Sequence, residues 1–509
     1  MDEMECSVSE NLVPTMNQEQ QKFDLDLLIE QVGPFGKFQL KLFSLLCISS
    51  AFATAFAFMF IFTAGEMSYR CRIPGCDGNC VSYQAPFLNF TIPVLKEGFS
   101  KCEMFQRTVS NTSLEDHCQW EFFDPEIVES CSEFVYEDGE ATILNEWNLG
   151  CSEEWKLSLV GTVNNIGQLL CLPLAGYLSD RFGRRTAFIW SVIFTASLGL
   201  IRSFSTNFTM FIVFEFLEPA LGSGMFNTAF ILAIFCSIGL ACLGVMFMLI
   251  RDWRLLMRIL YGAACFMITY QWLLPESPRW LVNKNRITEA AKIIDKTAKI
   301  NKKSLTLDAQ KMLNQMLKGE EKFLEIEQKT LTKKESRLKI LLKSPTMIFR
   351  FINCSISWIA TLFVYTGFNM TSVFISGDKY VNFIVSCLIE IPACAIGAWL
   401  MATIGRRKVL CMDFLLFPTE LRQSLFSGCS FFGRIGAILA PFTLYLGKYM
   451  ESMEMILFAA ITIPAGILIL FAPETLNKPL PDTIQDAENL KNAKSIRYDI
   501  LSPKHLILS

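Results

Sequence analysis

The strongest constraint on this chain is a succession of long apolar runs, most of them long enough to cross a lipid bilayer. They lie at roughly 40–64, 157–178, 187–203, 208–250, 255–274, 346–368, 379–404, 424–447 and 453–472. A helix needs about 20 apolar residues to span a bilayer, and lipid offers no partner for unpaired backbone groups. Each run is therefore predicted to be helical. The run 208–250 is either two helices with a tight turn or one over-long buried segment.

The composition agrees with a membrane protein. The chain of 509 residues is 52% hydrophobic and only 19% charged, with a mean hydropathy of +0.35. The first 37 residues are polar and acidic, and the run that follows them is too long for the core of a cleaved signal peptide. We predict an all-α polytopic membrane protein with nine or ten spans. An even number keeps both termini on one side, which we expect to be the cytoplasm.

Two long polar segments differ in composition. Residues 65–156 are acidic and carry glycosylation sequons at Asn89 and Asn111, which fits an extracellular loop. This loop also holds seven cysteines, which indicate an oxidising compartment: Cys71, Cys76, Cys80, Cys102, Cys118, Cys131 and Cys151. Because seven is odd, one thiol is free or pairs elsewhere, and the spacing does not define the connectivity. Residues 275–345 lack cysteine and are rich in lysine, which fits a cytoplasmic loop of short amphipathic helices.

These segments predict five parts. They are a cytoplasmic N-terminal segment (1–39), an N-terminal transmembrane bundle (40–274) that includes the loop 65–156, a cytoplasmic helical loop (275–345), a C-terminal transmembrane bundle (346–472) and a cytoplasmic tail (473–509).

A charged turn, GYLSDRFGRR at 176–185, separates the second and third apolar runs. Its arginines obey the positive-inside rule if the turn is cytoplasmic. Gly176 and Gly183 would allow a close helix approach and a tight turn. Charge balance does not require Asp180, which can pair with an arginine or face the N-terminal dipole of another helix. A plain basic loop is the alternative, which the spacing G-x-x-x-D-R-x-G-R-R disfavours.

This turn resembles the loop between helices two and three of the major facilitator superfamily. The matching residues are Gly176, Asp180, Arg181, Gly183, Arg184 and Arg185. Three further motifs are ESPRWL (276–281), FPTELR (417–422) and PETLNKPLPDTIQDAE (473–488). With the large cysteine-rich loop after the first helix, they make the chain similar to the organic cation/carnitine/organic anion transporter branch, and to its insect-type members most of all. The resemblance covers 23–488.

The resemblance implies a twelve-helix fold in which two six-helix halves rock around a central site near the bilayer midplane. The turn 176–185 would latch the halves on the inner side when the protein faces outward. The second-half counterpart, AWLMATIGRR, ends in Gly405, Arg406 and Arg407 but has Ala402 and Thr403 at the positions of the acid and the first arginine. The latch is therefore expected to be reduced in that half.

The chain is shorter than the family pattern. LCMDFLL (410–416) bridges a gap where family members have two spans, so helices nine and ten are predicted to be absent, which leaves about 10 of the usual 12. The loop between helices four and five is also lost. Both gaps join cytoplasmic ends, so the topology can survive. The pocket is affected, because the tenth helix helps to line it in this fold.

Charged side chains inside spans are costly and indicate functional sites. Arg434 resembles the basic residue of this helix in carnitine and organic anion carriers, where it would hold a substrate carboxylate through two hydrogen bonds. The alternative is an internal ion pair with Glu390 or another acid. Glu390 matches an acidic position in the eighth helix and would attract a quaternary ammonium group or respond to a coupling ion; a structural pairing is equally open.

Other polar and aromatic residues are weaker candidates. Tyr365 matches a pocket tyrosine of helix seven, and ring faces bind quaternary ammonium groups well. Glu215 and Glu218 are spaced i, i+3, so they share a helix face that must turn toward the bundle, either to the pocket or for a structural role. Asn164 and Gln168 either face the pocket or hydrogen-bond between helices, and we favour the second interpretation.

The sequence shows no enzyme site. The two histidines are His117 and His505, and there is no nucleophile–base pair, metal-ligand spacing or phosphate-binding glycine loop. We predict a protein without enzymatic activity that needs no cofactor or metal and binds no nucleic acid.

Two functions remain. The first is a plasma-membrane carrier of small organic ions, which include organic cations, zwitterions such as carnitine and organic anions, that works by alternating access. The second is a transport-inactive, truncated relative that acts as a membrane glycoprotein or is a non-functional isoform. The missing helices favour the second, whereas Arg434, Glu390 and the intact first-half turn favour the first. The sequence does not decide whether sodium, protons, exchange or the membrane potential drives transport.

Overall fold

The computed structural model describes most of the chain. The described residues are 28–29, 31–33, 36–78, 81–95, 98–108, 118–137, 139–222, 230–303, 305–318, 344–374, 377–403, 419–447, 450 and 452–469. Cys80, Asn111, His117, His505, Gly405, Arg406, Arg407 and the segments 410–416 and 473–488 lie outside them. The chain divides into two compact units, which we describe separately: Met1–Leu40 with Leu281–Lys333, and Lys41–Trp280 with Lys334–Ser509.

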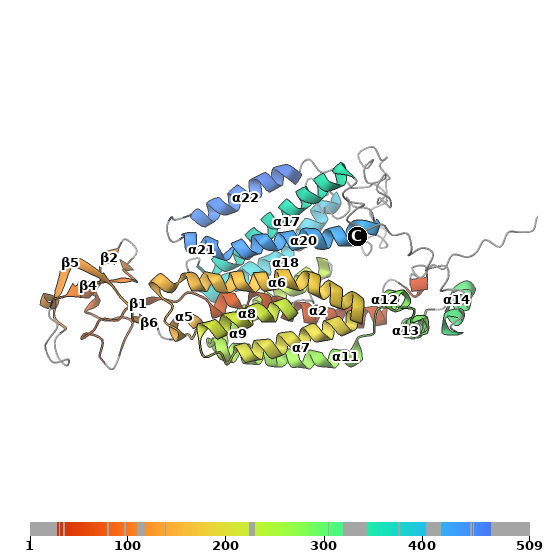
Figure 1. Ribbon diagram of the computed structural model, residues 1–509, viewed down its shortest axis with the longest axis horizontal. Helices are drawn as coiled ribbons and strands as arrows, with labels where there is room; N and C mark the ends of the chain where they lie inside the picture. The colour runs from red at the N-terminus through yellow and green to blue at the C-terminus, as the bar shows by residue number, and fades with distance from the viewer. Residues whose placement is uncertain are drawn as a thin grey trace, which may run out of the picture. The chain divides into compact units, whose positions relative to one another are not determined.

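The first half of the larger unit is a bundle of helices (Figure 1). They are α2 (Lys37–Phe58), α3 (Phe60–Thr63), α6 (Trp155–Phe182), α7 (Arg184–Arg202), α8 (Phe208–Gly222), α9 (Phe230–Ile250), α10 (Trp253–Ala264) and α11 (Tyr270–Leu273), with a 3₁₀ turn at Cys265–Thr269 and the short α12 (Pro278–Asn283) after them. The run 208–250 forms two helices, α8 and α9, which is the first of the two predicted alternatives.

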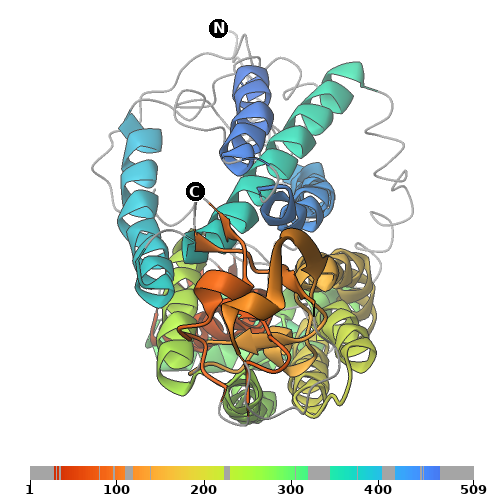
Figure 2. The same cartoon turned by 90° about the vertical axis from the view of Figure 1, so that its left-hand side faces the viewer.

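The second half lies beside the first in the same unit (Figures 1 and 2). It comprises α17 (Pro345–Thr371), a 3₁₀ turn at Ser372–Phe374, α18 (Lys379–Thr403), α20 (Thr419–Leu439), α21 (Pro441–Gly447) and α22 (Met453–Ile469). Ser344 caps α17, because its Oγ accepts the backbone N–H of Met347 at 3.3 Å and Pro345 occupies the first helical turn.

Five helices in the described residues are long and apolar enough to cross a membrane. They are Lys37–Thr63, Cys151–Phe182, Pro345–Phe374, Lys379–Gly397 and Gly428–Gly447, and Ile234–Ile250 and Met453–Leu468 are shorter apolar helices. Each predicted apolar run is helical where the structure describes it. The prediction of an all-α bundle is therefore confirmed, whereas the number of spans stays a prediction.

Glycines bring α17 and α20 into close contact. A Cβ atom added at Gly436 of α20 would collide with the backbone oxygen of Ile359 in α17. One added at Gly433 would lie 3.1 Å from Cβ of Trp358. In lipid, helices associate mainly through such close packing, because there is no hydrophobic driving force between them.

We expect Gly436→Val to push α17 and α20 apart and to lower the free energy of unfolding by about 1–3 kcal/mol. Thermal denaturation of the detergent-solubilised protein, followed by size-exclusion chromatography, measures this. Gly466→Val on α22 is the matched control, because a Cβ there meets nothing within 4 Å. Equal losses in the two variants would contradict the close approach at Gly436.

The polar segment 65–156, called here the cysteine-rich region, folds into small sheets at one end of the bundle (Figure 1). Three antiparallel pairs form: β1 (Tyr69–Cys71) with β6 (Phe134–Tyr136), β2 (Val94–Leu95) with β3 (Gly98–Phe99), and β4 (Glu103–Arg107) with β5 (Phe123–Ser130). The short helices are α4 (Leu88–Thr91) and α5 (Ile143–Glu146), with 3₁₀ turns at Trp120–Phe122 and Cys151–Glu153. Asn89 lies exposed on α4.

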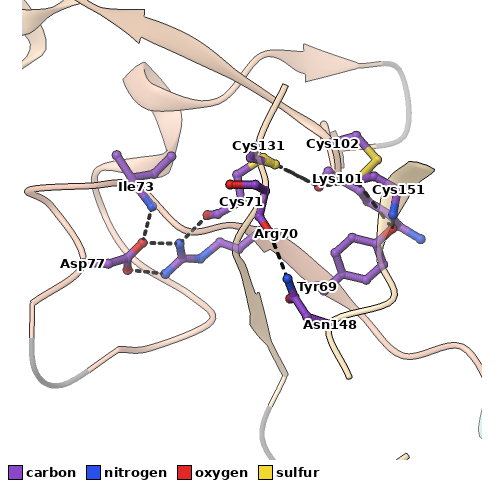
Figure 3. The surroundings of a disulfide bond; sticks show 11 residues. Tyr69, Arg70, Cys71, Ile73, Asp77, Lys101, Cys102, Cys131, Asn148 and Cys151 are labelled. Atoms are coloured by element: carbon purple, nitrogen blue, oxygen red, sulfur yellow. Dashed lines mark hydrogen bonds and ion pairs between the residues drawn. A yellow bond between two sulfur atoms is a disulfide. The ribbon is translucent and has the colours of Figure 1, made fainter. Parts of the chain in front are cut away.

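Three disulfides hold this region together and settle the connectivity that spacing left open. They are Cys71–Cys131, Cys76–Cys118 and Cys102–Cys151. Two of them lie close together beside Tyr69 (Figure 3). They close loops of 60, 42 and 49 residues, and in the chain-entropy view each contributes about 4 kcal/mol. Burial and a 2.5 Å hydrogen bond from its hydroxyl to Glu154 raise the pKa of Tyr69.

The smaller unit joins the N-terminal segment to the central loop. Its helices are α13 (Ile287–Asn301) and α14 (Leu307–Lys318), and α13 has the predicted amphipathic pattern with alanines and Ile294 buried. Asn301 connects the two segments: its Oδ1 accepts the backbone N–H of Phe38 at 3.1 Å, and its Nδ2 donates to Gln39 at 2.8 Å. No pattern in the sequence predicted this association.

Candidate functional site

A buried ion cluster joins three helices of the first half. Arg202, near the end of α7, is 1% exposed, and its Nη1 lies 2.5 Å from Glu215 and 3.4 Å from Glu218 on α8. Its Nη2 donates to the hydroxyl of Tyr261 on α10 at 2.7 Å, and that hydroxyl donates to Glu218 at 3.2 Å. One guanidinium contacts both acids, which confirms that they share a helix face.

Sequence reasoning missed Arg202 and Tyr261. Arg202 lies near the end of an apolar run, where a basic side chain usually extends to the membrane surface. The structural interpretation of Glu215 and Glu218 fits this arrangement, since both carboxylates hold α7 and α8 together. Direct contact of either acid with a substrate stays a prediction.

Two amides of α6 extend the cluster toward the second half. Asn164 Nδ2 donates to Glu215 Oε1 at 2.7 Å, and Gln168 Nε2 donates to Asn164 Oδ1 at 2.7 Å. Arg434 Nη1 on α20 donates to Gln168 Oε1 at 2.5 Å. The prediction that Asn164 and Gln168 hydrogen-bond between helices is confirmed. A continuous path of hydrogen bonds therefore runs from Arg202 to Arg434.

Glu390 takes part in a second bond between the halves. It is half-buried on α18 and accepts a 2.7 Å hydrogen bond from Ser237, which is fully buried on α9. Arg434 is also half-buried and contacts α6, so the two charges of the second half have different partners in the first half. Arg434 donates to Gln168 and Glu390 accepts from Ser237, so each of the two residues has a hydrogen bond to the first half.

Tyr365 lies near Glu390, on the neighbouring helix α17. It is half-buried, and its ring meets that of Phe58 edge to face with the two centroids 5.8 Å apart. Acids and aromatic rings are the groups that attract an organic cation, so Glu390 and Tyr365 stay candidates for such a contact.

The charged turn 176–185 is held by the motif ESPRWL. Glu276 Oε1 accepts the backbone N–H groups of Arg184 at 2.9 Å and Arg185 at 3.2 Å, so it caps the N-terminus of α7. Gly183 has φ +103°, and a Cβ at that position would collide with the Glu276 carboxylate. Only glycine combines this backbone conformation with that contact.

The same motif contacts the other end of the turn. Trp280 Nε1 donates to the backbone oxygen of Asp180 at 3.1 Å, whereas the Asp180 side chain is exposed. The acid that lies at the N-terminus of α7 is therefore Glu276, and the Asp180 carboxylate is exposed. Arg181 is exposed and donates to Tyr177 at 2.7 Å. The close helix approach predicted at Gly176 is wrong, because a Cβ there would meet nothing within 4 Å.

Two family models match the chain. The model described as "Sugar (and other) transporter" matches residues 218–417, and the model described as "Major Facilitator Superfamily" matches residues 142–235. The chain has the fold of the major facilitator superfamily. It is a multi-pass membrane protein, because several of its helices are long and apolar enough to cross a membrane.

The chain is similar to organic cation transporters and to members of solute carrier family 22. An organic cation transporter protein of Drosophila melanogaster is 24% identical over 527 residues, covering 91% of this chain and 94% of that protein. Solute carrier family 22 member 1 of Bos taurus is 27% identical, covering 92% and 93%. Organic cation transporter 1 of Caenorhabditis elegans is 26% identical, covering 92% and 88%. Because the Drosophila alignment is longer than this chain, that relative has segments that the chain lacks.

Solved structures of the superfamily are more distant. A crystal structure of a D-xylose-proton symporter is 13% identical with a TM-score of 0.41, covering 63% of this chain and 88% of that one. The inward-open xylose transporter XylE from E. coli is 14% identical with a TM-score of 0.37, covering 67% and 90%.

A cavity of about 590 Å³ lies where the two halves of this transporter meet the cysteine-rich region. Glu66, Glu140, Arg251 and Lys379 contribute charges of both signs to its lining. Glu140 accepts hydrogen bonds from Lys379 and from the hydroxyl of Tyr380, which connects the cysteine-rich region to α18 of the second half. Arg434, Glu390 and Tyr365 are not part of this lining.

Proposed function

We propose that this transporter carries small organic ions, and that it prefers compounds with both a quaternary ammonium group and a carboxylate, of which carnitine is an example. The observation that carries this proposal is the Arg434–Gln168 hydrogen bond, because it puts a guanidinium within a span at the contact between the two halves. The relatives named as organic cation transporters support the ammonium part of the substrate. Their coverage of nine-tenths of the chain does not favour a transport-inactive remnant.

The proposed binding groups divide according to charge. Arg434 presents a planar fork that matches a carboxylate, and such paired, charge-assisted hydrogen bonds are stronger than neutral ones. Glu390 and Tyr365 offer a carboxylate and a ring to the ammonium group. An ammonium group between the halves would exchange with the hydrogen bond that Ser237 donates to Glu390. Alternating access requires contacts of this kind to form and break.

The proposal includes an orientation in the plasma membrane. The disulfides of the cysteine-rich region and the exposed Asn89 support an extracellular position for it, with both termini in the cytoplasm. The turn 176–185 would then lie in the cytoplasm, where Glu276 holds its backbone and leaves the exposed Asp180 and Arg181 side chains to latch the second half. The five-part organisation and a non-enzymatic role belong to the same proposal, and the coupling ion is not assigned.

Uptake of labelled carnitine and tetraethylammonium by cells that express the chain tests the proposal. We expect Arg434→Ala to reduce carnitine uptake about 10- to 100-fold, because a hydrogen bond to a charged group contributes about 1.5–3 kcal/mol. Tetraethylammonium has no carboxylate, so its uptake should change much less. Surface biotinylation corrects for delivery.

Arg258→Ala is the matched control, since Arg258 is exposed on α10 and lies over the ring of Phe204. It should leave the uptake of both compounds unchanged. No uptake of either compound by wild-type protein at the surface would contradict the proposal and favour the inactive relative.

A further inference from the structure

We propose that Gln168 is the specificity-determining residue that lets the carrier accept a carboxylate, because it orients the Arg434 guanidinium without cancelling its charge. The inference rests on the proposed function, in which Arg434 contacts the substrate. Gln168 is a positioning residue: it acts through Arg434 and is 3% exposed on α6.

The two hydrogen bonds of the Gln168 amide fix its orientation. Its Nε2 donates to Asn164 Oδ1 at 2.7 Å, so its oxygen must point to the opposite side, where Arg434 Nη1 donates to it at 2.5 Å. A flipped amide would place its N–H groups against the guanidinium, which has only donors.

The carboxylate of Glu215 sets the direction of the whole path. Glu215 is held by Arg202, and an ionised carboxylate only accepts hydrogen bonds, so Asn164 has to present its nitrogen to Glu215 and its oxygen to Gln168. Every donor along the path therefore points away from Arg434 and toward Glu215. Chains of aligned hydrogen bonds polarise one another, which strengthens the acceptor at Gln168.

The hydrogen bonds from Glu215 to Arg434 orient the Arg434 side chain, but the two residues that make them carry no charge. The two neutral amides of Asn164 and Gln168 stand between the Glu215 carboxylate and the Arg434 guanidinium. Arg202 already lies within 2.5 Å of Glu215. An acid at position 168 would change this, because it would form an ion pair with Arg434 at hydrogen-bond distance. The guanidinium would then attract a substrate carboxylate much less.

The test is a comparison of KM values for carnitine and tetraethylammonium in Gln168→Glu. We expect the KM for carnitine to rise at least 10-fold, while the KM for tetraethylammonium stays within about twofold, which corresponds to a change in preference of about 1.4 kcal/mol or more. Gln168→Met removes the acceptor at similar volume and leaves the charge on Arg434. It should raise the KM for carnitine severalfold, less than Gln168→Glu does.

Asn165→Asp is the matched control. Asn165 is also a buried amide on α6, but its Nδ2 donates to the backbone oxygen of Gly161 on the same helix. Whatever amount of this variant reaches the surface, its ratio of carnitine to tetraethylammonium KM should equal that of the wild type. A purely structural effect of a carboxylate in α6 would change both variants alike.

The outcomes separate the two proposals. If Arg434→Ala changes the carnitine preference but Gln168→Glu and Gln168→Met do not, the inference on Gln168 is wrong and the proposed function stands. If Arg434→Ala leaves the preference unchanged, the proposed function itself is wrong. If Gln168→Glu does not reach the surface, Gln168→Met decides, and an unchanged KM for carnitine in that variant overturns the inference.

Discussion

Arg202→Met is expected to prevent the chain from reaching the cell surface in a folded state. The substitution leaves Glu215 and Glu218 buried beside each other without their shared guanidinium. Breaking a buried ion pair by removing one partner costs about 3–5 kcal/mol, a large part of a total stability of about 5–15 kcal/mol. Surface biotinylation and thermal denaturation of the solubilised protein measure the loss.

Removing the two acids as well should restore much of the stability. In the triple variant Arg202→Met, Glu215→Gln and Glu218→Gln, the cluster carries no charge, and neutral replacement of a buried ion cluster is often tolerated. Arg258→Met, at an exposed arginine of the same bundle, serves as the control. If Arg202→Met were as stable as the wild type, the two acids would not depend on this guanidinium.

Arg70→Met is expected to unfold the cysteine-rich region. Arg70 is 3% exposed, and its two terminal nitrogens lie 2.8 Å and 2.7 Å from the two carboxylate oxygens of Asp77 (Figure 3). It also donates to the backbone oxygens of Cys71, Ser82 and Tyr83, so one side chain organises the loop that follows β1. We expect a loss of about 3–5 kcal/mol.

Resistance of the region to limited proteolysis in intact cells measures this effect. The neighbouring Arg72→Met is the control, since Arg72 pairs with Glu133 at side-chain exposures of 47% and 68%. Such a surface pair contributes about 0–1 kcal/mol, so this variant should resist the protease as the wild type does. Equal sensitivity of the two variants would show that the Arg70–Asp77 pair does not hold the loop.

The sequence by itself determined the features that depend on local pattern and on solvent. Runs of apolar residues predict helices because a lipid core leaves the backbone no other partner, and each run is helical where it is described. The spacing of Glu215 and Glu218 predicts one shared face, and both contact Arg202. The division into helical halves and a cysteine-rich region follows from the same reasoning.

The tertiary structure alone decided which of these faces meet. Arg434 and Gln168 are separated by 266 residues, and Arg184 and Glu276 by 92. Even Arg202 and Glu215, separated by 13 residues, belong to different helices. The three disulfides are a further example, because the spacing of the cysteines allows many pairings and the fold decides which cysteines meet. A periodic pattern tells which side of a helix is polar, but the partner of that side depends on how the helices pack, and packing depends on contacts between residues that are distant in the sequence.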